Sequence, residues 1–524
     1  MKKSIYICLV LSALCTMAYA VPAHPGLRTR TLADGTRQTY YVHGDEFYHW
    51  ETSTLEPILT QEQQAHRAAA LTKAAHRMPA TIGVPYLPKR GLVILANFKD
   101  RKFKPENTQA QMDSLCNGLN YTYNGAYKSA AQYFKDQSNG HYCPKFDVVG
   151  PVELDSCYAY YGKNTPNDNG NDRYMADVII ESCQKAKTQF NVDFTQYAVA
   201  NPNEVDIVFV IYAGYGENET DDNDHDCLWP LQYTIDDACY WGYISNRFSK
   251  KDATIDGKRI NMFVYTNELQ YPSDARCGIG TLCHEFGHVL GLADYYNTVG
   301  NSYYSTLPFY WHTMDRGCYN DDGNRPPSYS PFEKFFFGWV TPQLLSKEQL
   351  VYTLPADGKT YAYLPKSGAA IDPTQYEDTV YYFENRQAQG WDKGLQKGVG
   401  PALGKGMLIW RVVFNKALWK DNEVNNSQNA PRISIVPSDG GKVVHNNNLD
   451  VYPGTNNVTT RQLFDDWTIY RIKDTEGVIT FQTKDIPTGW QSPLLKTYRK
   501  VLDQGQVKII DPKTNKSYTV LGNE

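Results

Sequence analysis

The sequence predicts an α+β protein in which an α/β region is followed by a β-rich region. In the first part, apolar strand-like runs at residues 91–98 and 205–212 alternate with helix-like stretches at 130–137 and 173–190. This alternation is typical of helices packed against a sheet. After Val340, short alternating runs separated by Gly, Asn, Asp and Pro indicate antiparallel strands.

The chain begins with the pattern of a signal peptide. Lys2 and Lys3 precede an apolar run at residues 5–17, and small residues follow up to Ala20. This is the order of an export signal, so we expect cleavage near Ala20 and a secreted, extracellular protein. The apolar run is too short to span a bilayer, and no later segment is long and apolar enough to do so.

Residues 21–88 separate the signal from the first apolar strand. The pair Asp34-Gly35 is a common turn between two strands, so we expect a hairpin there. Residues 60–76 are rich in Ala and Gln and predict a helix that leads into a Pro-containing linker.

The strongest functional pattern lies in residues 283–294. His284 and His288 are four residues apart, so on a helix both imidazoles can reach one metal ion. Glu285 is rotated about 100° from His284, which favours contact with a water rather than with the metal. Apolar residues at helical spacing predict one buried stripe: Ile279, Leu282, Cys283, Phe286, Val289 and Leu290.

A catalytic zinc site takes three protein ligands and leaves a fourth position open, so this helix lacks one ligand. Asp294 is the nearest candidate. Gly291 adopts a positive φ easily and can end the helix, which turns the chain so that Asp294 faces the metal. A carboxylate farther along the chain is the alternative third ligand.

A lone methionine, Met314, lies some twenty residues after Asp294 in the segment 312–317, where it looks like the Met-turn beneath a zinc site. His312 is close by in the sequence. We expect it at the surface or beside the ligands rather than on the metal.

These residues resemble the metzincin-like metallopeptidases, and more closely the immune inhibitor A family, in which Asp replaces the third His of the zinc motif. Similar family phrases occur at residues 89–98, 133–140, 208–216 and 329–334. The resemblance implies a secreted zinc endopeptidase with a metzincin-like α/β catalytic domain. It assigns three roles to residues of this sequence: zinc ligands His284, His288 and Asp294, general base Glu285, and structural floor Met314.

With this resemblance, the chain divides into five expected segments. They are a signal peptide (1–20), a propeptide-like region (21–88), the zinc metallopeptidase catalytic domain (89–345), a β-rich, sandwich-like C-terminal domain (346–490) and a short β-hairpin tail (491–524). A propeptide predicts a latent zymogen. Because no cysteine lies between Ala20 and Cys116, inhibition is expected from a carboxylate or histidine at zinc or from a blocked cleft. Asp45 and His49 are candidates for the first of these.

The expected reaction is hydrolysis of a peptide bond by a zinc-activated water. Glu285 would take the proton of the water and pass it to the leaving amine. Tyr319, five residues after Met314, is the first candidate for stabilising the tetrahedral oxyanion. The chain has 40 tyrosines, so Tyr329 and several others compete for this role.

Three other functions are weighed against a peptidase. A secreted zinc hydrolase of a non-peptide amide would share every catalytic residue. An inactive metalloprotease-like protein with a binding or adhesive role is disfavoured by the intact Glu285. A cysteine protease is disfavoured because no cysteine motif has a histidine partner as clear as the zinc pattern.

Nine of the 11 cysteines follow the signal. Exported chains commonly oxidise such cysteines. The spacing suggests local disulfide bonds between Cys143 and Cys157 or between Cys227 and Cys239, and the odd number leaves at least one thiol over.

Calcium is a second possible cofactor beside Zn²⁺. The acidic loop consists of Asp221, Asp222, Asn223, Asp224 and Asp226. Such a loop either binds Ca²⁺ through its oxygen atoms or is simply solvated.

The charge balance excludes one class of partner. The chain has 52 basic and 57 acidic side chains, a net charge of −5, and a pI of about 6.1. This balance argues against nucleic acid as a partner. Proteins or peptides are the expected substrates, and the sequence does not define an oligomeric state.

Overall fold

The structure is a computed structural model of the whole chain. It describes the following residues, to which every statement below refers: 19–32, 34–45, 48–54, 59–63, 65, 87–165, 168–220, 226–298, 307–396, 404–427, 430–440, 450–486, 499–503, 506–510 and 517–519.

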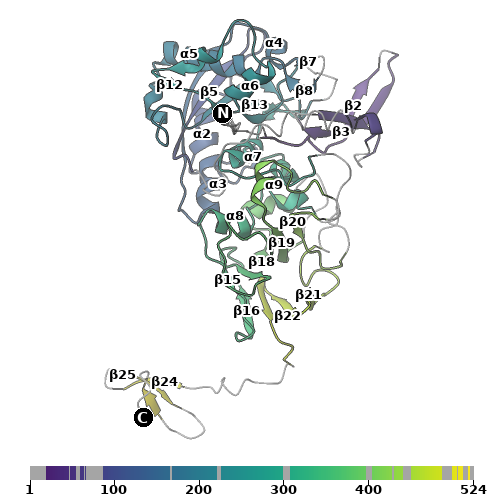
Figure 1. Ribbon diagram of the computed structural model, residues 1–524, viewed down its shortest axis with the longest axis vertical. Coiled ribbons are helices and arrows are strands. Elements are labelled where there is room, and N and C mark those ends of the chain that lie inside the picture. Colours follow the sequence, from purple (N-terminus) through teal and green to yellow (C-terminus); the bar gives the residue numbers. More distant parts are fainter. Residues whose placement is uncertain are drawn as a thin grey trace, which may run out of the picture.

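A central sheet, which includes the labelled strands β5 and β13, carries the first large region (Figure 1). Its strand order is β1-β10-β13-β9-β5-β6. Its strands are β1 (Tyr19–Ala20), β5 (Arg90–Asn97), β6 (Lys145–Glu153), β9 (Val208–Tyr215), β10 (Leu231–Thr234), β13 (Met262–Gln270) and β14 (Ala275–Arg276), which pairs with β13. β13, β9, β5 and β6 run parallel. β10 is antiparallel to β13, and β1 is antiparallel to β10. The sheet and its helices confirm the mixed α/β character predicted from the sequence.

Helices cover both faces of this sheet. They are α2 (Gln109–Asn117), α3 (Ala130–Gln137), α4 (Tyr158–Gly162), α5 (Met175–Phe190), α6 (Ile235–Trp241) and α7 (Gly280–Val289). A further helix, α8 (Pro331–Phe336), contacts the β-rich region instead. Because side chains alternate along a strand, β5 sends Val93 and Leu95 into a core with α2, α3 and α7. Leu92 and Ile94 enter a second core with α5.

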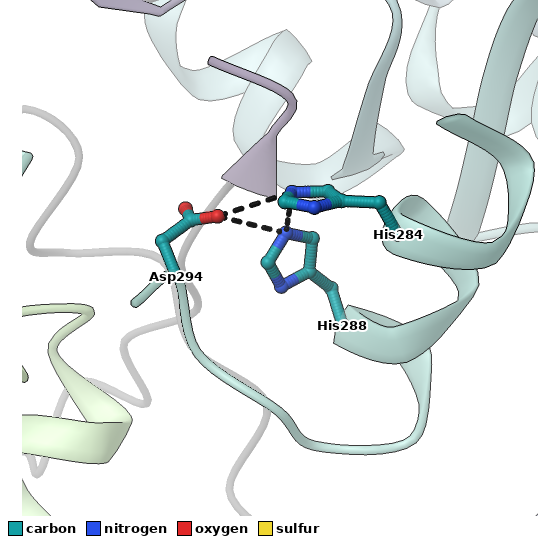
Figure 2. A group of neighbouring side chains, drawn as sticks. All are labelled: His284, His288 and Asp294. Atoms are coloured by element: carbon teal, nitrogen blue, oxygen red, sulfur yellow. Dashed lines mark hydrogen bonds and ion pairs between the residues drawn. The ribbon is translucent and has the colours of Figure 1, made fainter. Parts of the chain in front are cut away.

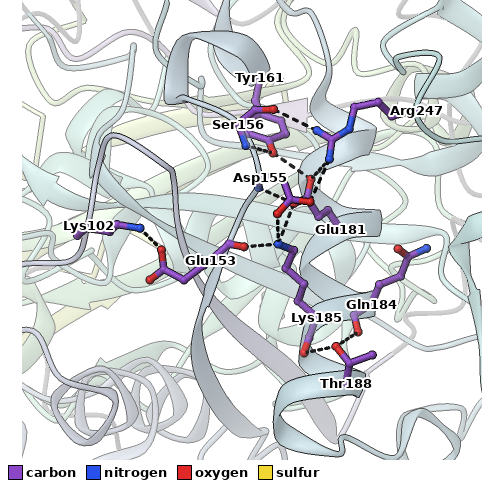
Figure 3. Close-up of polar contacts among 10 residues, drawn as sticks. All are labelled: Lys102, Glu153, Asp155, Ser156, Tyr161, Glu181, Gln184, Lys185, Thr188 and Arg247. Atoms are coloured by element: carbon purple, nitrogen blue, oxygen red, sulfur yellow. Dashed lines mark hydrogen bonds and ion pairs between the residues drawn. The ribbon is translucent and has the colours of Figure 1, made fainter.

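Polar contacts fix α5 beside the end of β6 (Figure 3). Lys185 lies 2.6 Å from Asp155 and 3.2 Å from Glu181, and Arg247 lies 3.1 Å from Glu181. Tyr161 donates a hydrogen bond of 3.0 Å to the same Glu181 carboxylate. The Asp155 pair is near the surface, where an ion pair stabilises a fold by only ~0–1 kcal/mol. Glu181 is buried, so its three partners also compensate for the burial of its carboxylate.

Two sheets form the β-rich region. One has the order β15-β17-β18-β19-β20 and the other the order β16-β23-β22-β21. The strands are β15 (Gln343–Leu344), β16 (Val351–Leu354), β17 (Ala362–Pro365), β18 (Thr379–Arg386), β19 (Gly406–Val413), β20 (Ile433–Ile435), β21 (Arg461–Phe464), β22 (Trp467–Thr475) and β23 (Val478–Gln482). Apolar side chains of both sheets share one core. The other face of the first sheet joins the core of α7 and α8, so apolar packing is continuous between the two regions.

Three strands occur within the predicted tail, where the sequence suggests a hairpin. β24 (Arg499–Asp503), β25 (Gln506–Ile510) and β26 (Ser517–Thr519) form an antiparallel sheet.

The region after the predicted signal forms a small sheet of β2 (Arg28–Thr31), β3 (Arg37–Asp45) and β4 (Tyr48–Thr52). The hairpin expected at Asp34-Gly35 is confirmed, because β2 pairs with β3 across it and Gly35 has a φ of 84°. The signal at residues 1–18, most of the predicted helix at 60–76, and Asp221 to Asp224 of the acidic loop lie outside the described residues.

The expected disulfide bonds are wrong: all nine cysteines are free thiols. Cys143 and Cys157 flank the nine-residue strand β6, which is about 30 Å long at ~3.3 Å per residue. A disulfide needs Cα atoms within about 7 Å. Cys227 and Cys239 are separated by β10, with Cys227 buried and Cys239 only half-buried on α6.

The described helices include none with the length and apolarity needed to cross a lipid bilayer.

Candidate metal centre

Helix α7 carries the two histidines in the middle of the molecule. The apolar stripe predicted for it is buried in the core formed with α2, α3 and the sheet. Its polar side is buried too, so all ten residues of the helix are inaccessible to solvent. The helix starts against the short helix η5 (Arg316–Tyr319), where a Cβ on Gly280 would lie 1.8 Å from the Cys318 carbonyl oxygen. Only glycine therefore fits at this position.

The end of α7 turns the chain back towards the histidines. Gly291 has a φ of 98°. Its N–H donates to the His288 carbonyl at 2.9 Å, and the Leu292 N–H donates to the Gly287 carbonyl at 3.0 Å. This pair of hydrogen bonds is the Schellman motif, which requires a left-handed residue after the helix. The turn predicted at Gly291 is therefore confirmed.

Replacing Gly291 by Ala should destabilise the protein by about 1–2 kcal/mol. Among the described residues, no atom outside the neighbouring chain lies within 4 Å of the position that a Cβ would take, so the expected cost comes from backbone strain. Thermal and denaturant unfolding measure it. Gly291→Asn is the matched control, because Asn adopts a positive φ more readily, and it should lose less. Equal stability of Gly291→Ala and the unaltered chain would contradict the expectation.

Three potential metal ligands converge beyond this turn (Figure 2). The Nε2 atoms of His284 and His288 are 3.1 Å apart. Asp294 Oδ1 lies 3.1 Å from the first of these nitrogens and 3.4 Å from the second. All three residues are buried, and their ligand atoms lie within 4.8 Å of one another.

The surrounding backbone orients both imidazoles. Nδ1 of His284 lies 2.8 Å from the Thr313 carbonyl oxygen, and Nδ1 of His288 lies 2.9 Å from the Leu292 carbonyl oxygen. A carbonyl accepts only from N–H, so each ring is protonated at Nδ1 and can turn the lone pair of Nε2 towards its partners. Metal-binding histidines are usually held by such a hydrogen bond to the second ring nitrogen.

The electrostatics of the three side chains suit a cation. Asp294 Oδ1 is buried and has no hydrogen-bond donor among the described residues. Burial lowers the pKa of His288. Burial would raise the pKa of Asp294, but the two adjacent histidines outweigh it and lower this pKa. A neutral imidazole and an ionised carboxylate are the forms that bind metal, so this donor set fits a zinc ion.

Glu285 points elsewhere, towards the beginning of the chain. Its Oε1 atom accepts a hydrogen bond of 2.7 Å from the backbone N–H of Val21. Burial and the charge of Asp294 raise the pKa of Glu285 well above its ordinary value. The carboxyl group can therefore hold a proton beside the three converging ligands.

The segment around Val21 covers this carboxylate. β1 extends the central sheet at the edge strand β10. Trp229 Nε1 donates to the Val21 carbonyl at 3.0 Å, and the Tyr319 hydroxyl donates to the Pro22 carbonyl at 2.6 Å. Residues 19–22 are therefore held by backbone hydrogen bonds to β10, Trp229, Tyr319 and Glu285.

The two side chains considered for inhibition lie away from the ligands. Asp45 accepts a hydrogen bond from the Tyr48 backbone at 3.4 Å. His49 stacks on Trp229 with ring centroids 5.0 Å apart and lies 3.5 Å from Glu217. Neither of these contacts involves His284, His288 or Asp294.

Met314 packs directly beneath the histidine helix. A Cβ on Gly287 would lie 2.5 Å from Met314 Sδ, and the Met314 carbonyl accepts from the Tyr295 N–H at 2.8 Å. His312 accepts from the Met314 N–H at 3.0 Å and lies 3.2 Å from Glu333. His312 thus supports the Met314 turn and stays outside the converging ligands.

Sequence reasoning missed two groups at this site. Nothing in the sequence around Val21, apart from its position after the predicted cleavage site, indicates a contact with Glu285. The side chain of Asn422, which contacts Asp294, lies in a polar loop with no motif. Neither contact can be found from local pattern, because the partners are 264 and 128 residues apart in sequence.

Comparison with known proteins finds matches to the region that contains the site. Residues 95–340 match the family model "Immune inhibitor A peptidase M6, catalytic domain". The pre-pro-metalloprotease PrtV of Vibrio cholerae serotype O1 is 25% identical over 273 residues, which cover 48% of this chain and 28% of PrtV. Immune inhibitor A of Bacillus thuringiensis subsp. alesti is 27% identical over 224 residues, which cover 39% of this chain and 31% of that protein. The chain thus spans less than a third of the length of these relatives. The resemblance inferred from the sequence is confirmed.

Proposed function

We propose that the protein is a zinc-dependent endopeptidase, because residues 95–340 match the catalytic-domain model of the immune inhibitor A peptidase family. His284, His288 and Asp294 would hold the zinc ion, and Glu285 would act as general base. One observation carries the proposal. The three buried ligand atoms converge on one point, where the Asp294 oxygen has no donor among the described residues.

A zinc ion bound here would supply Lewis acidity, polarising a carbonyl and favouring ionisation of water. The protein supplies the proton transfer. Glu285, next to His284 on α7, accepts the proton of the attacking water and delivers it to the leaving amine. Its raised pKa suits this role, because the carboxyl group must hold the proton between the two steps.

Two further side chains, those of Met314 and Tyr319, support the proposal. Met314 supports the histidine helix from below, in keeping with a metzincin-like catalytic domain. Tyr319 binds the carbonyl of Pro22 at 2.6 Å, which supports a role in holding a substrate carbonyl or the oxyanion formed from it. An extended substrate would then pair with the edge strand β10, as β1 does here.

We propose further that the protein is exported as a latent zymogen. The N–H of Val21 donates to the Glu285 carboxylate, and the carbonyls of Val21 and Pro22 accept from Trp229 and Tyr319. A substrate would need the same hydrogen-bonding groups. Cleavage near Ala20 would make Val21 the first residue of the exported chain. The relative PrtV carries the name pre-pro-metalloprotease, in line with a signal and a propeptide in this chain.

The zinc proposal predicts chelator-sensitive cleavage of an unstructured protein such as casein. The chain without residues 1–88 should bind about one zinc ion and cleave casein, and removal of zinc by a chelator should abolish this activity. Re-addition of zinc should restore it. Metal analysis and gel-based proteolysis measure both properties.

Three outcomes separate the possible functions. Folded protein that binds no zinc would overturn the proposal. Zinc binding without cleavage of any protein substrate would move the function to the hydrolysis of a non-peptide amide. Cleavage that resists the chelator would require a different catalytic group.

A further inference from the structure

A loop of the β-rich region contacts the segment that carries the third ligand. The loop follows α9 (Lys416–Lys420) and contains Asn422 and Asn425. It packs against residues 294–298, which follow the end of α7. Side-chain amides of the loop make several of the hydrogen bonds in this contact.

Asn422 holds Asp294 at two points. Its Nδ2 donates to Asp294 Oδ2 at 2.7 Å, and its Oδ1 accepts from the Asp294 backbone N–H at 2.8 Å. The Asn422 carbonyl also accepts a hydrogen bond of 3.1 Å from the hydroxyl of Thr298. Asn422 is buried and has a φ of 49°, a backbone conformation that Asn adopts more readily than most residues.

The contact with Asn422 gives the two oxygens of the Asp294 carboxylate different partners. Oδ2 is occupied by the amide of Asn422, and Oδ1 faces the two imidazole nitrogens at 3.1 and 3.4 Å. Rotation of the carboxylate about its Cβ–Cγ bond would break the hydrogen bond to Asn422. The amide therefore favours one orientation, in which a single oxygen is directed at the histidines.

Asn425 holds the same loop against Tyr295 on one side and residues 432–433 on the other. Its Nδ2 donates to the Tyr295 carbonyl at 2.8 Å and to the Ile433 carbonyl at 2.9 Å. Its Oδ1 accepts from the backbone N–H groups of Arg432 and Ile433 at 2.8 and 3.1 Å. Because Ile433 begins β20, these bonds anchor the loop to the first sheet of the β-rich region.

We propose that Asn422 is a positioning residue for the third zinc ligand, so that the β-rich region completes a metal site whose three ligands all lie in the peptidase domain. This inference rests on the proposed zinc-binding function. It gives the β-rich region a defined task, because the orientation of Asp294 depends on an amide that the peptidase domain does not supply. Groups that hold a ligand in this way typically change metal affinity 10–100-fold when they are replaced.

The test measures zinc affinity in the full chain by competition with a chromophoric chelator. Asn422→Ala and the nearly isosteric Asn422→Asp should each raise the zinc dissociation constant about 10–100-fold. Asn422→Asp replaces the amide donor with a carboxylate beside Asp294 Oδ2, so its zinc affinity should fall even if the fold is unchanged. Cobalt(II) in place of zinc should show an altered visible spectrum in both variants, because the orientation of one ligand changes.

Asn415→Ala is the matched control. Asn415 caps α9 through a hydrogen bond to the Leu418 N–H at 3.0 Å and lies outside the Asp294 contact. Its loss should lower the unfolding temperature while leaving the zinc dissociation constant unchanged. A zinc affinity that is unchanged in both Asn422 variants would overturn the positioning role and leave the peptidase proposal standing. Absence of zinc from the unaltered folded chain would overturn both.

Discussion

Replacing Glu285 by Gln should lower kcat/KM for an unstructured protein substrate by about 10²–10⁴-fold, the usual contribution of a general acid-base group. An amide can neither accept the proton of the water nor deliver one to the leaving amine. Zinc content should stay unchanged, because Glu285 is not among the three converging ligands. Steady-state kinetics and metal analysis on the same preparation measure both values.

The stability of Glu285→Gln separates a catalytic loss from a folding defect. Burial raises the pKa of Glu285, so the charged form is costly inside the protein and a neutral amide of the same shape should not lower the unfolding temperature. His288→Ala is the contrasting variant, since removal of a ligand should abolish both zinc binding and activity. Full activity of Glu285→Gln would overturn the role of this carboxylate, and loss of zinc would place it among the ligands instead.

Local pattern was sufficient to predict the histidine helix and its end. The apolar spacing from Ile279 to Leu290 identifies the buried side of α7, and that side lies in the core. Gly291 predicts the turn that ends the helix, and its φ of 98° is the left-handed conformation that this turn requires. Both features depend on residues within one or two helical turns, where periodicity and glycine conformation are strong signals.

Long-range contacts were beyond reach from one sequence. Nothing near Val21 indicates that its N–H meets Glu285, and nothing near Asn422 indicates that its amide holds Asp294. The apolar stripe also does not reveal that the side of α7 that carries His284 and His288 is buried. Such contacts follow from how separate units of the fold pack together, which hydrophobic periodicity does not encode.

The disulfide expectation failed for a related reason. Proximity in sequence suggested Cys143 with Cys157, but the residues between them form the extended strand β6. An extended strand separates its two ends by about 3.3 Å per residue. Sequence distance is therefore a poor guide to spatial distance wherever a strand intervenes.

Release of residues 21–88 should raise the initial rate of casein cleavage by at least roughly 10²-fold. The Val21 N–H is bound to Glu285, and the carbonyls of Val21 and Pro22 accept from Trp229 and Tyr319. On the latency proposal, a substrate binds these groups only after the segment leaves. A protease site engineered between residues 65 and 87 of the chain 21–524 allows cleavage after folding, and casein hydrolysis is followed before and after the cut. Equal rates before and after complete removal of the fragment would contradict latency.

Arg28 offers a way to weaken the closed state by a single substitution. It is buried, and its guanidinium donates to the backbone carbonyls of Asn218, at 2.6 Å, and of Thr220. Hydrogen bonds from a charged donor contribute about 1.5–3 kcal/mol each, so Arg28→Ala should raise the activity of the uncleaved chain roughly 10–100-fold. Arg30→Ala is the matched control, because Arg30 pairs with Glu51 inside the same small sheet and should leave latency intact. If both variants stayed equally latent, the anchor would lie elsewhere than at Arg28. A rise in Arg28→Ala alone would show that the chain start is held closed by its contact with residues 218–220, and that peptidase activity and latency compete for the same hydrogen-bonding groups.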